Sequence, residues 1–204
     1  GARMPKGLGE ATAKAICRVE RETGKIFGSS SNPLLVSVRS GAAVSMPGMM
    51  DTVLNLGLTD AAVQGLIKLT GNARFAWDAY RRLINMFGDV VVGMEHEDFE
   101  HEFDLVKKKF GVELDTELSA EGLEEVCNRY KKAYKKHVGS AFPQDPYKQL
   151  SLSIEAVFKS WNTHRAKSYR QINGIVGLKG TAVNVQAMVF GNMGTDSGTG
   201  VAFT

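Results

Sequence analysis

The sequence predicts an α+β fold in which strands from both chain ends form a sheet and a helical insertion lies on top of it. Three observations support this prediction: a short apolar run at residues 34–38, apolar spacing of three and four from about residue 60 to 172, and a strand-like segment at residues 182–190. Two β-containing ends that flank a long helical middle are typical of a sheet-based core with an inserted helical part.

The composition is that of an ordinary globular domain. The 204 residues are 43% hydrophobic and 23% charged, which argues against disorder, and no run approaches the roughly 20 apolar residues of a membrane span. Cys17 and Cys127 form no Cys-x-x-Cys pair, so we expect neither a disulfide framework nor a zinc site. The net charge of +3 is too small to indicate nucleic acid by itself.

The first third of the chain combines a helix with the first strand. Residues 8–23 form an amphipathic pattern that Gly24 ends, and the apolar strand 34–38 follows. A lone Arg39 ends this strand and a glycine-containing loop leads to a second apolar run. Thr59 then has the character of a helix cap.

Four further helices are predicted between residues 60 and 140. The first ends near Gly71, the second at Gly88 and the third at Gly111, because glycine commonly follows the last helical turn. Ser119 is the expected cap of the fourth helix.

A fifth and longer helix precedes the C-terminal strands. Asp145 and Pro146 form its predicted start, and apolar residues continue to Ile172 as one helix of about seven turns. Glycines between residues 174 and 180 end it. Strands are then expected at residues 182–190 and 199–203, with a turn between them.

The segment from Arg39 to Thr52 has the clearest chemical character. A strand that ends in arginine and continues into a glycine loop can present backbone N–H groups and one fixed positive charge to an anion. Arginine suits this role because its planar group binds phosphate oxygens in two places. A tight turn with a solvated charge remains the alternative, and no Gly-Lys-Ser/Thr of a Walker loop is present.

Two runs in this segment, Arg39-Ser40-Gly41-Ala42 and Met46-Pro47-Gly48-Met49-Met50-Asp51-Thr52, resemble the signature of the nucleotide-binding domain of pyruvate, phosphate dikinases. Related water dikinases carry Arg-Ser-Ser-Ala at the first run. The resemblance implies a partial ATP-grasp-like nucleotide-binding core built from both chain ends. Residues 1–59 would be its first part with the phosphate loop, 60–173 a helical subdomain and 174–204 its returning strands.

The resemblance also implies roles for individual residues. Arg39 would hold the ATP polyphosphate and stabilise charge during phosphoryl transfer, as the catalytic residue of this segment. Asp51 would order the loop or a magnesium ion, with capping of the next turn as the alternative, and the methionines pack beneath the loop. The expected cofactor-binding residues of the loop are Gly48, Met49, Met50, Asp51 and Thr52.

At the other chain end, the family's adenine contacts map onto Gln186 and onto the main chain of Met188 and Val189. An amphipathic strand with a polar outer face is the alternative for Gln186. Thr199 matches a family threonine near the phosphates, and a turn threonine is the alternative.

The full family reaction converts ATP, phosphate and pyruvate to AMP, pyrophosphate and phosphoenolpyruvate through a phosphohistidine on another domain. The expected cofactors are ATP and Mg²⁺, with most metal ligands outside this chain. The expected partners are the phosphohistidine domain and the pyruvate-binding barrel, in a homo-oligomer without nucleic acid or membrane. We expect an intracellular protein, in the cytosol, a plastid or a microbody, and a chain that is inactive as an isolated fragment.

Other interpretations of the chain remain open. The main alternative is a non-catalytic helical docking module that has lost nucleotide binding. Nucleic-acid binding through residues 131–136 is weaker, because Tyr130 and Tyr134 continue an apolar stripe. His96 and His101 are five residues apart, not the four that place two imidazoles on one helix face for zinc.

Overall fold

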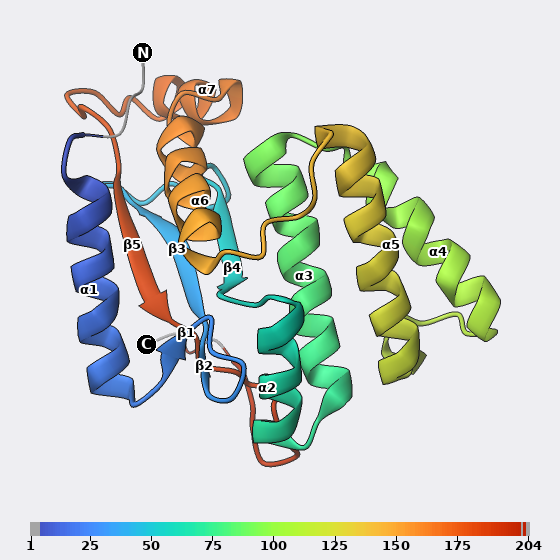
Figure 1. Cartoon of the computed structure of the whole chain (residues 1–204). Helices are drawn as coiled ribbons and strands as arrows, with labels where there is room; N and C mark the ends of the chain where they lie inside the picture. Colours follow the sequence, from blue (N-terminus) through green and yellow to red (C-terminus); the bar gives the residue numbers. More distant parts are fainter. Residues whose placement is uncertain (1–4, 201, 203–204) are drawn as a thin grey trace.

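The computed structural model describes residues 5–200 and 202, and it shows a small sheet with helices beside and over it (Figure 1). The sheet has the order β4-β3-β5, with strands β3 (Val36–Gly41), β4 (Thr52–Leu56) and β5 (Ala182–Ala187). Both neighbours of β3 are antiparallel to it. The pairing of β3 with β5 confirms that the two chain ends meet in one sheet.

The register of the sheet separates an apolar face from a polar one. Val38 lies opposite Val53 and Val185, and Val38 and Val53 are fully buried. They belong to the same core as Leu150 and Val157 of the covering helix α6 (Pro146–Ser160). Because side chains alternate along a strand, the cross-strand neighbours of Arg39 project from the opposite face.

A bulge interrupts the β3–β4 pairing between Val36 and Val38. Asn55 has a positive φ of 62° there, and its side-chain amide donates to the carbonyl of Ala79 at 3.0 Å. This bond ties the sheet to the helix that carries Ala79.

The N-terminal part contains α1 (Leu8–Thr23) and the short parallel strands β1 (Ile26–Phe27) and β2 (Pro33–Leu34). The helix agrees with the prediction, whereas the strand expected at residues 34–38 is wrong in its bounds. Leu35 separates β2 from β3. Strand β3 continues to Gly41 because β4 pairs with it as far as Arg39 and β5 as far as Gly41.

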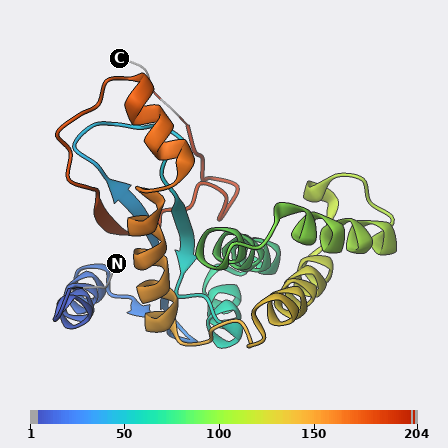
Figure 2. The same ribbon diagram turned by 90° about the horizontal axis from the view of Figure 1, so that it is seen from above.

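Four helices lie to one side of the sheet (Figure 2). The side chains of Thr59, Asn72 and Ser119 cap three of them, so the predicted caps at Thr59 and Ser119 are confirmed. A single 3₁₀ turn, η1 (Asp115–Glu117), precedes the last helix. The four helices are α2 (Asp60–Thr70), α3 (Ala73–Val92), α4 (His96–Phe110) and α5 (Ala120–Val138).

The expected helix end at Gly88 is wrong, because α3 continues to Val92 and Gly93 adopts the left-handed cap conformation. Gly88 instead permits close packing, since a Cβ built there would lie 2.3 Å from Cζ of Phe99. The ends predicted at Gly71 and Gly111 are confirmed by their positive φ values of 66° and 67°.

The single long helix expected from Pro146 to Ile172 is also wrong. The chain turns at residues 161–163 between α6 and α7 (His164–Ile172). The hydroxyl of Thr163 accepts the N–H of Ala166 and begins the second helix. The guanidinium of Arg170 lies 3.9 Å from the Trp161 ring centroid and closes the corner.

Strand β5 ends at Ala187, three residues before the predicted end, although the N–H of Met188 still donates to the carbonyl of Leu35 at 2.8 Å. The second C-terminal strand is not observed at Thr199, Gly200 or Ala202, and the remaining residues of that prediction lie outside the described part of the chain.

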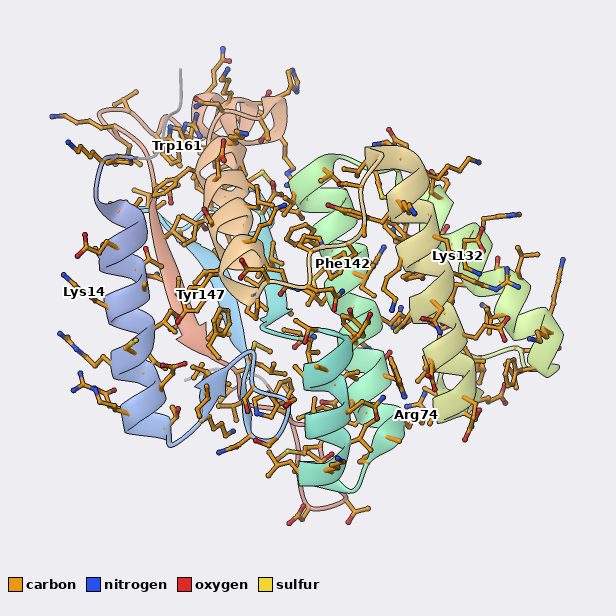
Figure 3. All side chains as sticks on the ribbon, in the orientation of Figure 1. Lys14, Arg74, Lys132, Phe142, Tyr147 and Trp161 are labelled. Carbon is orange, nitrogen blue, oxygen red and sulfur yellow. The ribbon has the colours of Figure 1, made fainter. Side chains whose placement is uncertain are left out.

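An aromatic cluster joins the helices beside the sheet. Phe142 lies between α3 and α5, with its ring 5.3 Å from that of Phe87 and 5.4 Å from that of Tyr134 (Figure 3). Tyr147 meets Phe27 edge-on at 5.3 Å nearer the sheet. Over residues 5–200 and 202, none of the helices has both the length and the apolar character that a membrane crossing requires.

Candidate functional site

A hollow of about 520 Å³ opens where β3, its following loop and β4 meet. One continuous segment of the chain forms it, so its shape depends on the conformation of that loop. The lining residues are Arg39, Ser40, Gly41, Ala42, Ala43, Val44, Ser45, Met46, Pro47, Gly48, Met50 and Thr52.

Arg39 supplies the positive charge of this hollow. Its side chain is exposed, and it makes no ion pair or side-chain hydrogen bond with any of the described residues. Thr52 and Asn184 lie directly opposite it on the two neighbouring strands. The guanidinium therefore retains its hydrogen-bonding capacity for an anion in the hollow.

The loop exposes its main chain at Gly48. The N–H of Met49 donates to the carbonyl of Met46 at 3.1 Å and closes a turn around Pro47 and Gly48. Gly48 has φ 71°, and a Cβ built there would have no atom within 4 Å. The glycine thus permits both the left-handed turn and a close approach of a ligand to the backbone.

The methionines of the loop differ in position. Met46 and Met50 both line the hollow, and Met46 is buried while Met50 is partly exposed. Met49 does not line the hollow, although its carbonyl accepts a long bond of 3.4 Å from Nε of Arg165.

Asp51 lies outside the hollow and pairs with α7. Nη2 of Arg165 donates to its Oδ1 at 2.8 Å, and its N–H donates to Oγ of Ser160 at 3.3 Å. Burial raises the pKa of the Asp51 carboxyl above its ordinary value, while the charge and hydrogen bond of Arg165 act in the opposite direction. In this conformation Asp51 contacts the α6–α7 corner and does not line the hollow.

The predicted adenine contacts lie along β5 and just beyond it. Gln186 is exposed and lies opposite Ser37, on the same face of the sheet as Arg39. The N–H of Met188 is already bound to Leu35, which leaves its carbonyl as the main-chain group for a ligand. Val189 is 93% exposed.

Thr199 follows a turn that leads away from the loop. Phe190 packs edge-on against Phe75 at 5.0 Å, and Asn72 donates to the carbonyl of Met193 at 3.2 Å. These contacts hold the turn at the start of α3, at the opposite end of the sheet from the β3–β4 loop (Figure 1). The structure therefore brings Arg39, Gly48, Met50 and Thr52 together, and it does not bring Thr199 to them.

Sequence reasoning missed Ser160 and Arg165, which contact the loop from the α6–α7 corner. The available signal was the polar cluster Asn162-Thr163 within the apolar rhythm, because such residues commonly begin a helix.

Within residues 5–200 and 202, no group of three or more His, Cys, Asp or Glu side chains is arranged to hold a metal ion.

A mixed helix-and-sheet fold with an open cationic hollow defines a candidate phosphate-binding domain. The profile of the family "Pyruvate phosphate dikinase, AMP/ATP-binding domain" matches residues 2–204, and the chain belongs to this family.

Relatives are similar over the full length of this chain. Pyruvate, phosphate dikinase of Giardia intestinalis is 59% identical over 203 residues, and that of Rhizobium meliloti (strain 1021) is 56% identical over 204. The chloroplastic pyruvate, phosphate dikinase 1 of Arabidopsis thaliana is 55% identical over 204 residues. All three alignments cover 100% of this chain but only 21–23% of the relative, so the chain spans about a fifth of their length.

Proposed function

We propose that this chain binds ATP as its magnesium complex and supplies the phosphate loop of a pyruvate, phosphate dikinase. The observation that carries the proposal is the guanidinium of Arg39, which has no ion-pair partner in the described part of the chain and lies at a hollow lined by a glycine loop. The family match and the identity to dikinases support the choice of ATP as the ligand.

In this proposal each group of the hollow has a defined task. Arg39 binds phosphate oxygens and stabilises the charge that spreads over them during phosphoryl transfer. Main-chain N–H groups near Gly48 and the hydroxyl of Thr52 provide further hydrogen bonds. Gln186 and the main chain of Met188 and Val189 bind the adenine.

Thr199 joins the phosphates only if the turn before it moves, since its present contacts hold that turn near α3. The magnesium ion enters with the nucleotide and neutralises phosphate charge.

The larger proposal concerns the whole enzyme. It converts ATP, phosphate and pyruvate to AMP, pyrophosphate and phosphoenolpyruvate, through a phosphohistidine domain and a pyruvate-binding barrel in a homo-oligomer. Residues 1–59 and 174–204 form an ATP-grasp-like core, and residues 60–173 form a helical subdomain whose α6 covers the sheet. The relatives named above, one of them chloroplastic, fit an intracellular enzyme in the cytosol or an organelle.

Calorimetric titration with magnesium–ATP tests the binding proposal. We expect saturable binding by the wild type and a dissociation constant about tenfold or more higher for Arg39→Ala, because charge-assisted hydrogen bonds to phosphate are lost. Arg21→Ala removes an exposed arginine of α1 and is the matched control, with unchanged affinity expected. Binding that Arg39→Ala leaves intact contradicts the proposal, and no binding by the wild type favours the docking module.

A further inference from the structure

The corner between α6 and α7 lies directly against the phosphate loop (Figure 2). Ser160, the last residue of α6, is buried, and its hydroxyl accepts the N–H of Asp51 at 3.3 Å while donating to the carbonyl of Val157 at 2.8 Å. Arg165, in the first turn of α7, donates to Asp51 at 2.8 Å. Helices α6 and α7, both far from the loop in sequence, thus contact the same loop residue, Asp51.

The break between the helices makes this double contact possible. In a continuous helix, residues 160 and 165 would lie about 140° apart around the axis and about 7.5 Å apart along it. They would then point to different neighbours. The cap at Thr163 redirects the chain, so that Ser160 holds the backbone of Asp51 and Arg165 holds its carboxylate.

We infer that Arg165 and Ser160 form a positioning clamp that fixes the conformation of the phosphate loop through Asp51. The inference rests on the proposed function in so far as the loop binds the phosphates of ATP. It assigns a positioning role to Arg165, which does not line the hollow.

Packing alone does not hold Asp51 in place. A cleft of about 180 Å³ separates it from parts of α3 and α6, and its lining includes Val90, Glu155 and Lys159. The Asp51 side chain is 22% exposed and the Arg165 side chain 53% exposed, so the ion pair is reachable by water. The contacts of Arg165 and Ser160 with Asp51 are therefore the shortest polar ties between the loop and the corner, and a longer bond of 3.4 Å joins Nε of Arg165 to the carbonyl of Met49.

A loop that is already ordered binds a ligand more tightly than a mobile one, because the entropy cost of ordering the loop arises on folding and not on binding. Residues 42–51 of the loop form no helix or strand, and Gly48 lies among them. Holding the residue that precedes β4 restricts the last part of the loop, next to Thr52. We therefore expect the clamp to act on ligand affinity without contacting the ligand.

A double-mutant cycle with magnesium–ATP tests the coupling. Arg165→Ala and Asp51→Asn should each raise the dissociation constant about two- to fivefold, the range for a partly exposed ion pair. The double variant should bind magnesium–ATP no more weakly than Arg165→Ala alone, because each single substitution already removes the Arg165–Asp51 ion pair. Arg165→Lys should lose less affinity than Arg165→Ala, since it keeps the charge without the planar geometry.

Lys159→Ala is the matched control, because Lys159 pairs with Glu155 on its own helix at 2.8 Å. We expect it to leave the dissociation constant unchanged. Fully additive losses from the two clamp substitutions, or an equal loss in the control, overturn the inference.

Carboxyl NMR titration provides a readout that does not need ATP. The groups that face Asp51 are Arg165 of α7, Asp89 of α3, and Glu155 and Lys159 of α6. Arg165→Ala should raise the pKa of Asp51 further and shift the amide resonances of residues 48–52, whereas Lys159→Ala should not shift those amides. An unchanged Asp51 pKa and unchanged loop amides overturn the clamp even if ATP binds. If the clamp signals appear but the wild type does not bind ATP, the proposed function fails and the clamp stands.

Discussion

The charged side chains of helices α2–α5 and of the β3–β4 loop region differ in whether they form ion pairs. In the helices, Asp78 binds both Arg81 and Arg82 at 2.8 Å, and Arg129 bridges Glu102 and Glu125. In the loop region, Asp51 pairs with Arg165, but Arg39 has no ion-pair partner among the described residues and borders an open hollow. Paired charges serve the fold, whereas an unpaired guanidinium beside exposed backbone is available to a ligand. Substitutions in the helices should therefore change stability, and those in the loop should change binding.

The largest effect on stability is expected for Phe87→Ala. Phe87 is fully buried, and its ring packs against Tyr134 and Phe142. Its truncation should lower the free energy of unfolding by about 3–5 kcal/mol through lost burial and a cavity. Urea denaturation measures this loss. Weaker magnesium–ATP binding by the protein while it is still folded would contradict the separation of the two regions.

Asp78→Asn should lower the free energy of unfolding by about 3 kcal/mol. The Arg81 side chain is 13% exposed and would lose its carboxylate partner, and a buried charge left unpaired is costly. Denaturation at pH 7 measures the loss, with Asp104→Asn as a control whose carboxylate is 62% exposed. A loss in Asp78→Asn as small as in the control would show that the pairing contributes little.

The same aspartate predicts a pH dependence. Burial alone would raise the pKa of Asp78, but Arg81 and Arg82 together hold it below its ordinary value of 3.8. The ionised form is thus favoured by folding, and its contribution to stability is present above pH 3.8 and lost as the pH falls further through the folded pKa. Acid titration of stability should show this loss in the wild type and not in Asp78→Asn.

Two glycines offer a sharper comparison between the regions. Gly48 and Gly111 have φ values of 71° and 67°, and a Cβ would meet no atom within 4 Å at either. Each substitution to alanine should cost about 1 kcal/mol of stability through the left-handed backbone. Only Gly48→Ala should also weaken magnesium–ATP binding. Equal binding by both variants would show that the loop conformation does not matter to the ligand.

The smallest effect on stability is expected for Arg39→Ala. With no partner to lose among the described residues, the variant should unfold within about 0.5 kcal/mol of the wild type. Its loss of affinity would then not result from unfolding. A stability loss above about 1 kcal/mol would instead assign Arg39 a structural role.

Local sequence signals predicted most of the helices but not every boundary. Thr59 and Ser119 mark true helix starts, and Gly71 and Gly111 mark true ends, because capping depends on neighbouring residues alone. The helix end predicted at Gly88 is wrong, because this glycine instead makes room for the ring of Phe99 from another helix. That contact is tertiary and has no local signature.

The site was also predictable only in its local part, because contacts between distant segments leave no local sequence signal. Arg39 and the glycine loop lie within one short segment, and all the residues that line the hollow belong to that segment. The Arg165–Asp51 pair joins residues 114 positions apart, and it depends on a helix break that apolar spacing concealed. The position of the turn before Thr199 likewise depends on contacts with α3.

The most direct test of the central claim is a backbone-amide and arginine side-chain NMR titration of the wild-type protein with magnesium–ATP. We predict saturable shifts at Arg39, Gly48, Met50 and Thr52 with one common dissociation constant, while amides of α5 remain unmoved. Saturable shifts that gather on α5, or a spectrum that does not respond near the hollow at any ATP concentration, would contradict the account.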